Sequence, residues 1–417
     1  MINVESEESE STYKINYWIM VASWIVLGPT WVITGTYFQH YIRGLGGSDV
    51  IISLVASIST LILAFARIIG GYLADTVGRK AIILPLTFVL AFINLIYFIA
   101  WSWEIVLIAV IINNIILLYQ PALDAILADS ISKEKRGVGY GLSNFLVGIL
   151  SPVSTFLAIY LVSKYGVVEG VRIGYLISFG LTLSAGFLRI KLKETVKPIQ
   201  VKKLSFKHFI GEYTGSLHII RERLPGYLLL LIMFNAIIGL TVLTPIYVTY
   251  YLGFGEEIWG YYSFISGMLG WILAIPLGFL VDKVGRKFGL FISVASLMAS
   301  NFVLFMMHTL PKDVILLFGV GLIGGISWTA WSSAASALWA DLVPKSVRGR
   351  ISAITNLLGS ISYTISGIFG GIIYHSLGAE IPFLWSAIIS ILALGVLISM
   401  TPETRAKKLM NNKDYIW

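Results

Sequence analysis

Apolar stretches of about 20 residues, each closed by a short polar turn, alternate along the whole chain. A helix of that length crosses the roughly 30 Å hydrocarbon core of a bilayer, whereas barrel strands would be half as long and alternate in polarity. Helices also satisfy their own backbone hydrogen bonds inside lipid. The pattern predicts an all-α integral membrane protein with twelve spans, at residues 17–40, 49–73, 80–101, 105–128, 138–163, 171–190, 225–251, 258–281, 288–308, 313–340, 350–376 and 381–401.

Composition agrees with a membrane protein. Of the 417 residues, 57% are hydrophobic and only 12% are charged, about half the charged share of a soluble domain. The chain has no cysteine, five scattered histidines and no phosphate-binding P-loop string, which excludes thiolate sites and argues against an ATP-driven pump. We therefore expect no enzyme, no catalytic residue, no cofactor and no metal.

The basic residues predict the orientation. An even number of spans puts both termini on one side, and 25 of the 30 Lys and Arg residues fall on the side of the N-terminus. Basic loops stay in the cytoplasm, so we expect both termini there, in a multi-pass protein of the cytoplasmic (plasma) membrane. The first 16 residues are acidic, unlike a signal peptide. The net charge of +8 thus points to the membrane and not to nucleic acid.

A ten-residue string occurs twice. Residues 71–80 (GYLADTVGRK) recur 207 positions later as residues 278–287 (GFLVDKVGRK), each copy between two apolar runs. The first glycine of each copy, Gly71 or Gly278, is expected to let helices approach closely. The second, Gly78 or Gly285, suits a tight turn.

Two further echoes support a duplication. Asp129 is followed at seven residues by Arg136, and Asp341 at seven by Arg348, while residues 194–195 and 403–404 both read Glu-Thr. Half-length repeats are typical of transporters. We expect two six-helix pseudo-repeats, residues 1–190 and 225–417, joined by a linker at 191–224. The linker forms either a lateral amphipathic helix on the membrane or a helix packed on the bundle.

The repeated string resembles the signature loop of the major facilitator superfamily, which lies between helices two and three and again between helices eight and nine. The resemblance covers nearly the whole chain, and Val281 is a departure where alanine is usual. It implies a twelve-helix fold that works by alternating access. It also implies a cytoplasmic gate that holds the halves together on the inner face, made of Gly71, Asp75, Gly78, Arg79, Asp129, Arg136, Gly278, Asp282, Gly285, Arg286, Asp341 and Arg348.

Arg67 and Asp124 are ionisable residues within spans of the first half and have no ionisable counterpart in the second half. Arg67 lies two helical turns before Asp75, and Asp124 just over one turn before Asp129, whereas the second half has Ala274 and Ser336 there. Charges inside a membrane are functional candidates. We interpret the two either as a proton-coupling pair or as a static structural pair, or else Arg67 simply reaches toward the inner gate.

The resemblance places helices one, four, seven and ten around the central cavity. Their polar and aromatic side chains favour a neutral or amphiphilic solute over a polyanion. Any of them could instead be an interfacial anchor or helix-packing contact. The cavity candidates are Trp31, Thr34, Tyr37, Asn113, Asn114, Gln120, Asn235, Thr244, Trp328 and Trp331.

These observations predict a secondary transporter of a small organic solute, with a proton gradient as a candidate driving force. Its partners would be the solute, membrane lipids and protons, and the functional unit a monomer. A multidrug/proton antiporter is the alternative, although Ser151 stands where the antiporter motif has glycine. A solute sensor or lipid scramblase is the alternative of another class.

Overall fold

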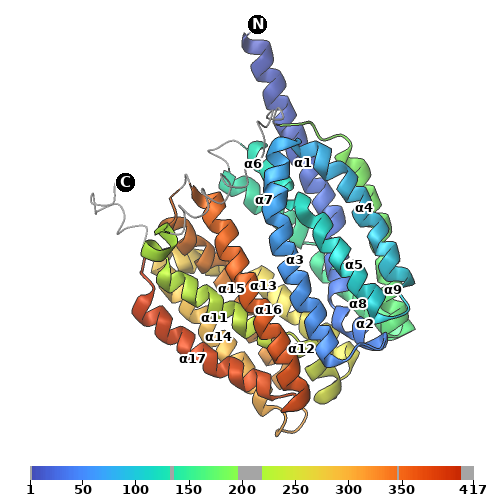
Figure 1. Ribbon diagram of the computed structural model, residues 1–417, viewed down its shortest axis with the longest axis vertical. Coiled ribbons are helices and arrows are strands. Elements are labelled where there is room, and N and C mark those ends of the chain that lie inside the picture. The colour runs from blue at the N-terminus through green and yellow to red at the C-terminus, as the bar shows by residue number, and fades with distance from the viewer. Residues whose placement is uncertain (1, 132–135, 196–217, 345–346, 405–417) are drawn as a thin grey trace. The chain divides into compact units, whose positions relative to one another are not determined.

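The computed structural model describes residues 2–131, 136–195, 218–344 and 347–404, apart from the side chains of 2–14, 75 and 136–138 (Figure 1). These ranges are helical and contain no strand. Twelve helical runs in them are long and apolar enough to cross a membrane. The prediction of twelve spanning helices is therefore confirmed.

Ten helical elements make up the described part of the first half. Their bounds are α1 (Ile2–Gly35), α2 (Phe38–Gly44), α3 (Asp49–Thr76), α4 (Arg79–Ile99), α5 (Trp103–Ile116), η1 (Leu117–Tyr119), α6 (Gln120–Asp129), α7 (Arg136–Gly148), α8 (Ser151–Tyr165) and α9 (Val167–Arg189). Within this half α9 packs against both α1 and α4.

Eight elements follow where the structure describes the second half. Their bounds are α11 (Pro225–Leu240), α12 (Thr244–Ile246), η3 (Tyr247–Tyr251), α13 (Glu256–Val284), α14 (Arg286–Met306), α15 (Val314–Leu342), α16 (Arg348–Ser376) and α17 (Ile381–Met400). Here α15 packs against α13 and α14, while α11 packs against α16 and α17.

The chain forms two compact units. One contains residues 1–47 and 58–204, and the other contains residues 48–57 and 205–417. The first turns of α3 thus group with the second unit. Most of the linker predicted at 191–224 lies outside the described ranges, because residues 196–217 are not among them. This part holds most of the residues expected to form the amphipathic helix.

The structure differs from the sequence pattern at the first span, which was expected at 17–40. Helix α1 ends at Gly35, and α2 begins at Phe38. Gly35 and Thr36 favour helix weakly, and the Thr36 hydroxyl donates back to the Val32 carbonyl at 2.7 Å. The apolar pattern runs on across this break and therefore hides it.

Two other spans are interrupted. Between α5 and α6 the chain tightens into the 3₁₀ turn η1, next to Pro121, and after α11 it passes Pro245 into the π-turn η3. Each interruption lies beside a proline, which has no N–H to donate to the preceding turn. Proline alone does not decide the break, since Pro29, Pro85 and Pro276 lie inside the regular helices α1, α4 and α13. Both interruptions bring non-regular backbone into the middle of a span.

Candidate functional site

A cluster of charged side chains surrounds the start of α4. Gly78 precedes the helix with φ of 103°, a conformation that favours glycine. The next residue, Arg79, forms an ion pair with Asp129 at the end of α6. Its Nη1 also donates to the Thr195 hydroxyl at 2.9 Å. We name Arg79, Asp129, Glu194 and Thr195 the first charge cluster.

Glu194 completes this cluster by capping α4. Its Oε2 accepts the backbone N–H of Lys80 at 2.9 Å, while Lys80 Nζ donates to the Ile190 carbonyl at 2.9 Å. A carboxylate at a helix N-terminus satisfies an otherwise unpaired N–H and opposes the helix dipole. The contact ties the chain after α9 to the start of α4.

The second half repeats this geometry. Gly285, with φ of 140°, precedes Arg286, whose Nε lies 3.1 Å from Asp341 Oδ2 and whose Nη1 lies 3.1 Å from Asp282 Oδ1. Thr404 donates its hydroxyl to Asp341 at 2.7 Å. We name Asp282, Arg286, Asp341, Glu403 and Thr404 the second charge cluster.

Glu403 caps α14 as Glu194 caps α4. Its two oxygens accept the backbone N–H groups of Arg286 and Lys287 at 2.9 and 3.1 Å. Lys287 Nζ donates to the Ile398 carbonyl at 2.7 Å, the counterpart of the contact between Lys80 and Ile190. The two Glu-Thr strings are therefore structural counterparts.

Other predicted gate residues lie differently. Arg348 is not paired with Asp341: its Nη2 and Nε donate to the Ala340 and Val343 carbonyls at 2.6 and 3.2 Å, at the end of α15. A cation there compensates the negative end of the helix dipole. The side chains of Asp75 and Arg136 lie outside the described part of the chain.

The first glycines of the repeat do not mark close helix contacts. A Cβ on Gly71 would meet only Pro121 Cβ, at 4.0 Å, and a Cβ on Gly278 would meet nothing within 4 Å. The neighbour Gly70 makes the close approach instead, since a Cβ there would lie 1.6 Å from the Leu118 carbonyl oxygen. The expectation for Gly71 and Gly278 was wrong because the repeat pattern does not specify which helix face packs.

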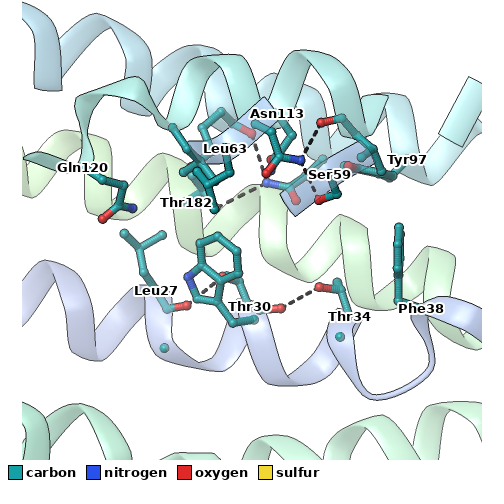
Figure 2. Close-up of a pocket in the computed structure, with 18 of the residues that line it drawn as sticks. Leu27, Thr30, Thr34, Phe38, Ser59, Leu63, Tyr97, Asn113, Gln120 and Thr182 are labelled. Carbon is teal, nitrogen blue, oxygen red and sulfur yellow. Dashed lines mark hydrogen bonds between the residues drawn. The ribbon is translucent and has the colours of Figure 1, made fainter. Parts of the chain in front are cut away.

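A cavity of about 640 Å³ lies inside the first unit. Figure 2 shows Leu27, Thr30 and Thr34 on one wall, with Ser59 and Asn113 on the other. Five predicted cavity residues line it, namely Trp31, Thr34, Asn113, Asn114 and Gln120. Its volume is typical of small-molecule sites.

Hydrogen bonds fix part of the cavity wall. Asn114 Nδ2 donates to the Ser59 hydroxyl at 2.9 Å and to the Val110 carbonyl at 2.8 Å. Asn94 Nδ2 donates to the Thr182 hydroxyl at 3.4 Å. These bonds hold amide groups at the wall, where their remaining oxygens can receive a solute's polar hydrogens.

The remaining predicted cavity residues do not line this cavity. Tyr37 is fully buried and does not line this cavity. Asn235 and Thr244 donate to the carbonyls of Leu231 and Thr241, at 2.8 and 2.5 Å, which are local helix contacts.

The two candidate tryptophans of α15, Trp328 and Trp331, also differ from each other. Trp331 is buried and stacks on Phe234, with ring centroids 3.6 Å apart. Trp328 lines a groove of about 350 Å³ between α13 and α15.

Arg67 and Asp124 lie near each other but form no ion pair in the described part of the chain. Both side chains are exposed, and Arg67 lines the cavity whereas Asp124 does not. The charge of Arg67 acts on Asp124 through space. The same ranges contain no group of three His, Asp or Glu residues that could hold a metal ion.

Sequence reasoning missed Arg189. The charge pattern assigns it to the cytoplasmic basic residues, because it falls at the end of the predicted span 171–190. In the structure Arg189 is completely buried, lines the cavity, and donates to the hydroxyls of Ser23 and Thr87. Its position next to two Lys residues of the linker concealed it.

Comparison with known proteins identifies the family. A family model described as the Major Facilitator Superfamily matches residues 17–362. The chain belongs to this superfamily. Membership makes it a multi-pass membrane transporter rather than an enzyme.

A curated transport protein is similar to part of the chain. The inner membrane transport protein YajR of Escherichia coli (strain K12) is 27% identical over 170 residues, which are 40% of this chain and 36% of that protein. The alignment thus spans about a third of the relative's length.

Solved structures share the superfamily fold. A mutant of the nucleoside transporter NupG has a TM-score of 0.71 at 14% identity, over 94% of this chain and 100% of that one. A D-xylose-proton symporter has a TM-score of 0.70 at 16% identity, over 93% and 97%. A POT family transporter in complex with 5-aminolevulinic acid has 0.69 at 13%, over 95% and 96%.

Proposed function

We propose that this transporter moves a small organic solute with an apolar or aromatic body across the cytoplasmic membrane by alternating access. The observation that carries the proposal is the cavity of about 640 Å³, where Trp24, Trp31 and Tyr97 lie among amide and hydroxyl side chains. Aromatic faces bury an apolar body, and amides orient polar groups. The similarity to YajR, which is named an inner membrane transport protein, supports a location in the cytoplasmic membrane. The basic residues support cytoplasmic termini.

We further propose that the two charge clusters are the cytoplasmic gate. Each holds an arginine at a helix start against a carboxylate at the end of a neighbouring span. Partly exposed ion pairs contribute on the order of 1 kcal/mol each, so solute binding can supply enough free energy to open several. Gly78 and Gly285 would permit the turns, and Arg348, Asp75 and Arg136 would belong to the same inner face.

Coupling to protons is proposed for Asp124, with Arg67 as the nearby cation. Structures of similar fold include a D-xylose-proton symporter, and Arg67 occupies the cavity wall close to Asp124. We expect Asp124→Asn to abolish pH-driven accumulation and to spare solute exchange. Unchanged accumulation would remove Asp124 as the proton carrier.

Transport itself is tested with the purified chain in lipid vesicles. A panel of solutes is offered with and without an imposed pH gradient, and protein-free vesicles give the background. The proposal expects saturable uptake of at least one solute above that background. Absence of uptake for every solute, with the protein folded and inserted, would contradict it.

A further inference from the structure

A buried arginine of the first unit donates its hydrogen bonds to neutral side chains. Arg189, the last residue of α9, is 0% exposed. Its Nε donates to the Ser23 hydroxyl at 3.2 Å and its Nη1 to the Thr87 hydroxyl at 2.8 Å, while the Tyr119 ring lies 5.8 Å from Cζ. Among the described residues no carboxylate forms an ion pair with Arg189.

The third guanidinium nitrogen is unsatisfied. Nη2 of Arg189 is buried and has no hydrogen-bond partner in the described part of the chain. Arginine does not lose its proton in proteins, and an unpaired buried charge is strongly destabilising. A structural role, in which Arg189 links α9 to α1 and α4, explains the hydrogen bonds of Nε and Nη1, yet a neutral side chain could form such a link. This role explains neither the unsatisfied Nη2 nor the need for a positive charge at this position.

The cavity beside Arg189 is positively charged. Arg67 and Arg189 both line it, and no Asp or Glu is among its described lining residues. Such a wall raises the local concentration of anions and favours them over cations. The other lining groups, including Trp31 and Asn113, are aromatic or neutral and polar. The cavity therefore combines one buried charge with a surface for an apolar body.

We propose that the solute is an amphiphilic monocarboxylate and that Arg189 Nη2 binds its carboxylate. This inference rests on the proposed transport function and narrows its solute, a small molecule with an apolar or aromatic body, to an anion. Ser23 and Thr87 already accept from Nε and from one N–H of Nη1, so few donors remain, and they suit a singly charged group better than a phosphate dianion. Nη2 is sealed from water in this conformation, so the solute reaches it when the cavity wall moves during transport.

The test compares acids with their uncharged amides. Benzoate and benzamide, 3-phenylpropionate and 3-phenylpropionamide, and octanoate and octanamide are titrated into the purified full chain by calorimetry. Each pair has the same body and differs in charge. We expect at least one acid to bind about tenfold more tightly than its amide, since hydrogen bonds to charged groups are the strong ones.

Substitutions of Arg189 test whether this residue causes the tighter binding of the acid. Arg189→Gln should remove the difference between acid and amide, whereas Lys191→Gln, which removes an exposed charge two residues away, should keep it. If Arg189→Gln does not fold, Arg189→Lys keeps the charge without the planar fork. That variant should lower the affinity for the acid several-fold and leave the amide unchanged.

The outcomes separate this inference from the transport proposal. It is overturned if no acid binds more tightly than its amide, if the preference survives in Arg189→Gln, or if Arg189→Lys leaves it undiminished. Saturable uptake of neutral solutes without a preference for acids would support the transport function and contradict the proposal that the solute is a carboxylate. Tighter binding of an acid without uptake of any solute would support the carboxylate site and contradict the transport proposal.

Discussion

The two carboxylates that contact Arg286 are expected to differ in importance, although each lies 3.1 Å from the guanidinium. The Asp341 side chain is 22% exposed and that of Asp282 is 71% exposed. Water screens the exposed pair, which leaves it worth about 0.5 kcal/mol. The partly buried, charge-assisted contact of Asp341 is worth about 2 kcal/mol. This ranking follows from burial alone.

Thermal unfolding of the purified protein checks that ranking. Asp341→Asn should lower the melting temperature clearly, and Asp282→Asn, the matched control on the same arginine, should hardly change it. Equal effects of the two substitutions would show that burial does not decide the strength of these contacts.

Neighbouring glycines of α3 give a second test at the residue scale. Gly70→Ala would place a methyl group 1.6 Å from the Leu118 carbonyl oxygen, whereas Gly71→Ala would touch only Pro121 at 4.0 Å. Overpacking against backbone should cost about 3 kcal/mol or more. We expect Gly70→Ala to reduce the yield of folded protein and its melting temperature, with Gly71→Ala close to the parent. The reverse order would contradict the packing of α3 on η1.

Single residues were predictable where the chemistry repeats and not where packing decides. Arg79 and Asp129, both assigned to the gate through the family resemblance, form an ion pair in the structure. Trp31 and Trp331 look alike in sequence, yet one lines the cavity and the other stacks in the core. Arg189 was hidden because a basic residue at a span end is normally a solvated anchor.

At the scale of elements, the starts of α4 and α14 depend on glutamates more than 100 residues away in sequence. Glu403 satisfies two N–H groups of α14, and losing such a cap costs about 1 kcal/mol. We expect Glu403→Ala to speed amide hydrogen exchange at Arg286 and Lys287. Glu104→Ala, at an exposed position in the first turn of α5, is the control; equal exchange in both variants would argue against the cap.

Helix positions followed from apolar length because a span must cover a fixed thickness of lipid. The interruptions within the helices could not be predicted from apolar length. The regular backbone is interrupted next to Pro121 and Pro245 inside spans, and their apolar neighbours keep the hydropathy high. The end of α1 at Gly35 was missed for the same reason. Hydropathy reports burial in lipid and not backbone hydrogen bonding.

At the scale of the molecule, each unit carries one charge cluster built in the same way, which agrees with the half-length repeat. The cavity and Arg189 belong to the first unit. We therefore propose that gating depends on features that both halves share, and that solute recognition depends chiefly on one half. Loosening both clusters should then change access to the cavity without changing its lining.

The absence of cysteine from the sequence permits a direct measurement of that access. A single cysteine is introduced as Asn113→Cys in the cavity wall, with Trp101→Cys, 73% exposed, as an accessible reference. An impermeant maleimide is applied separately to each face of oriented vesicles. Alternating access with the two clusters as the inner gate predicts that adding Asp129→Asn and Asp341→Asn raises labelling of the cysteine at position 113 from the inner face and lowers it from the outer face. Unchanged labelling from both faces would contradict the account.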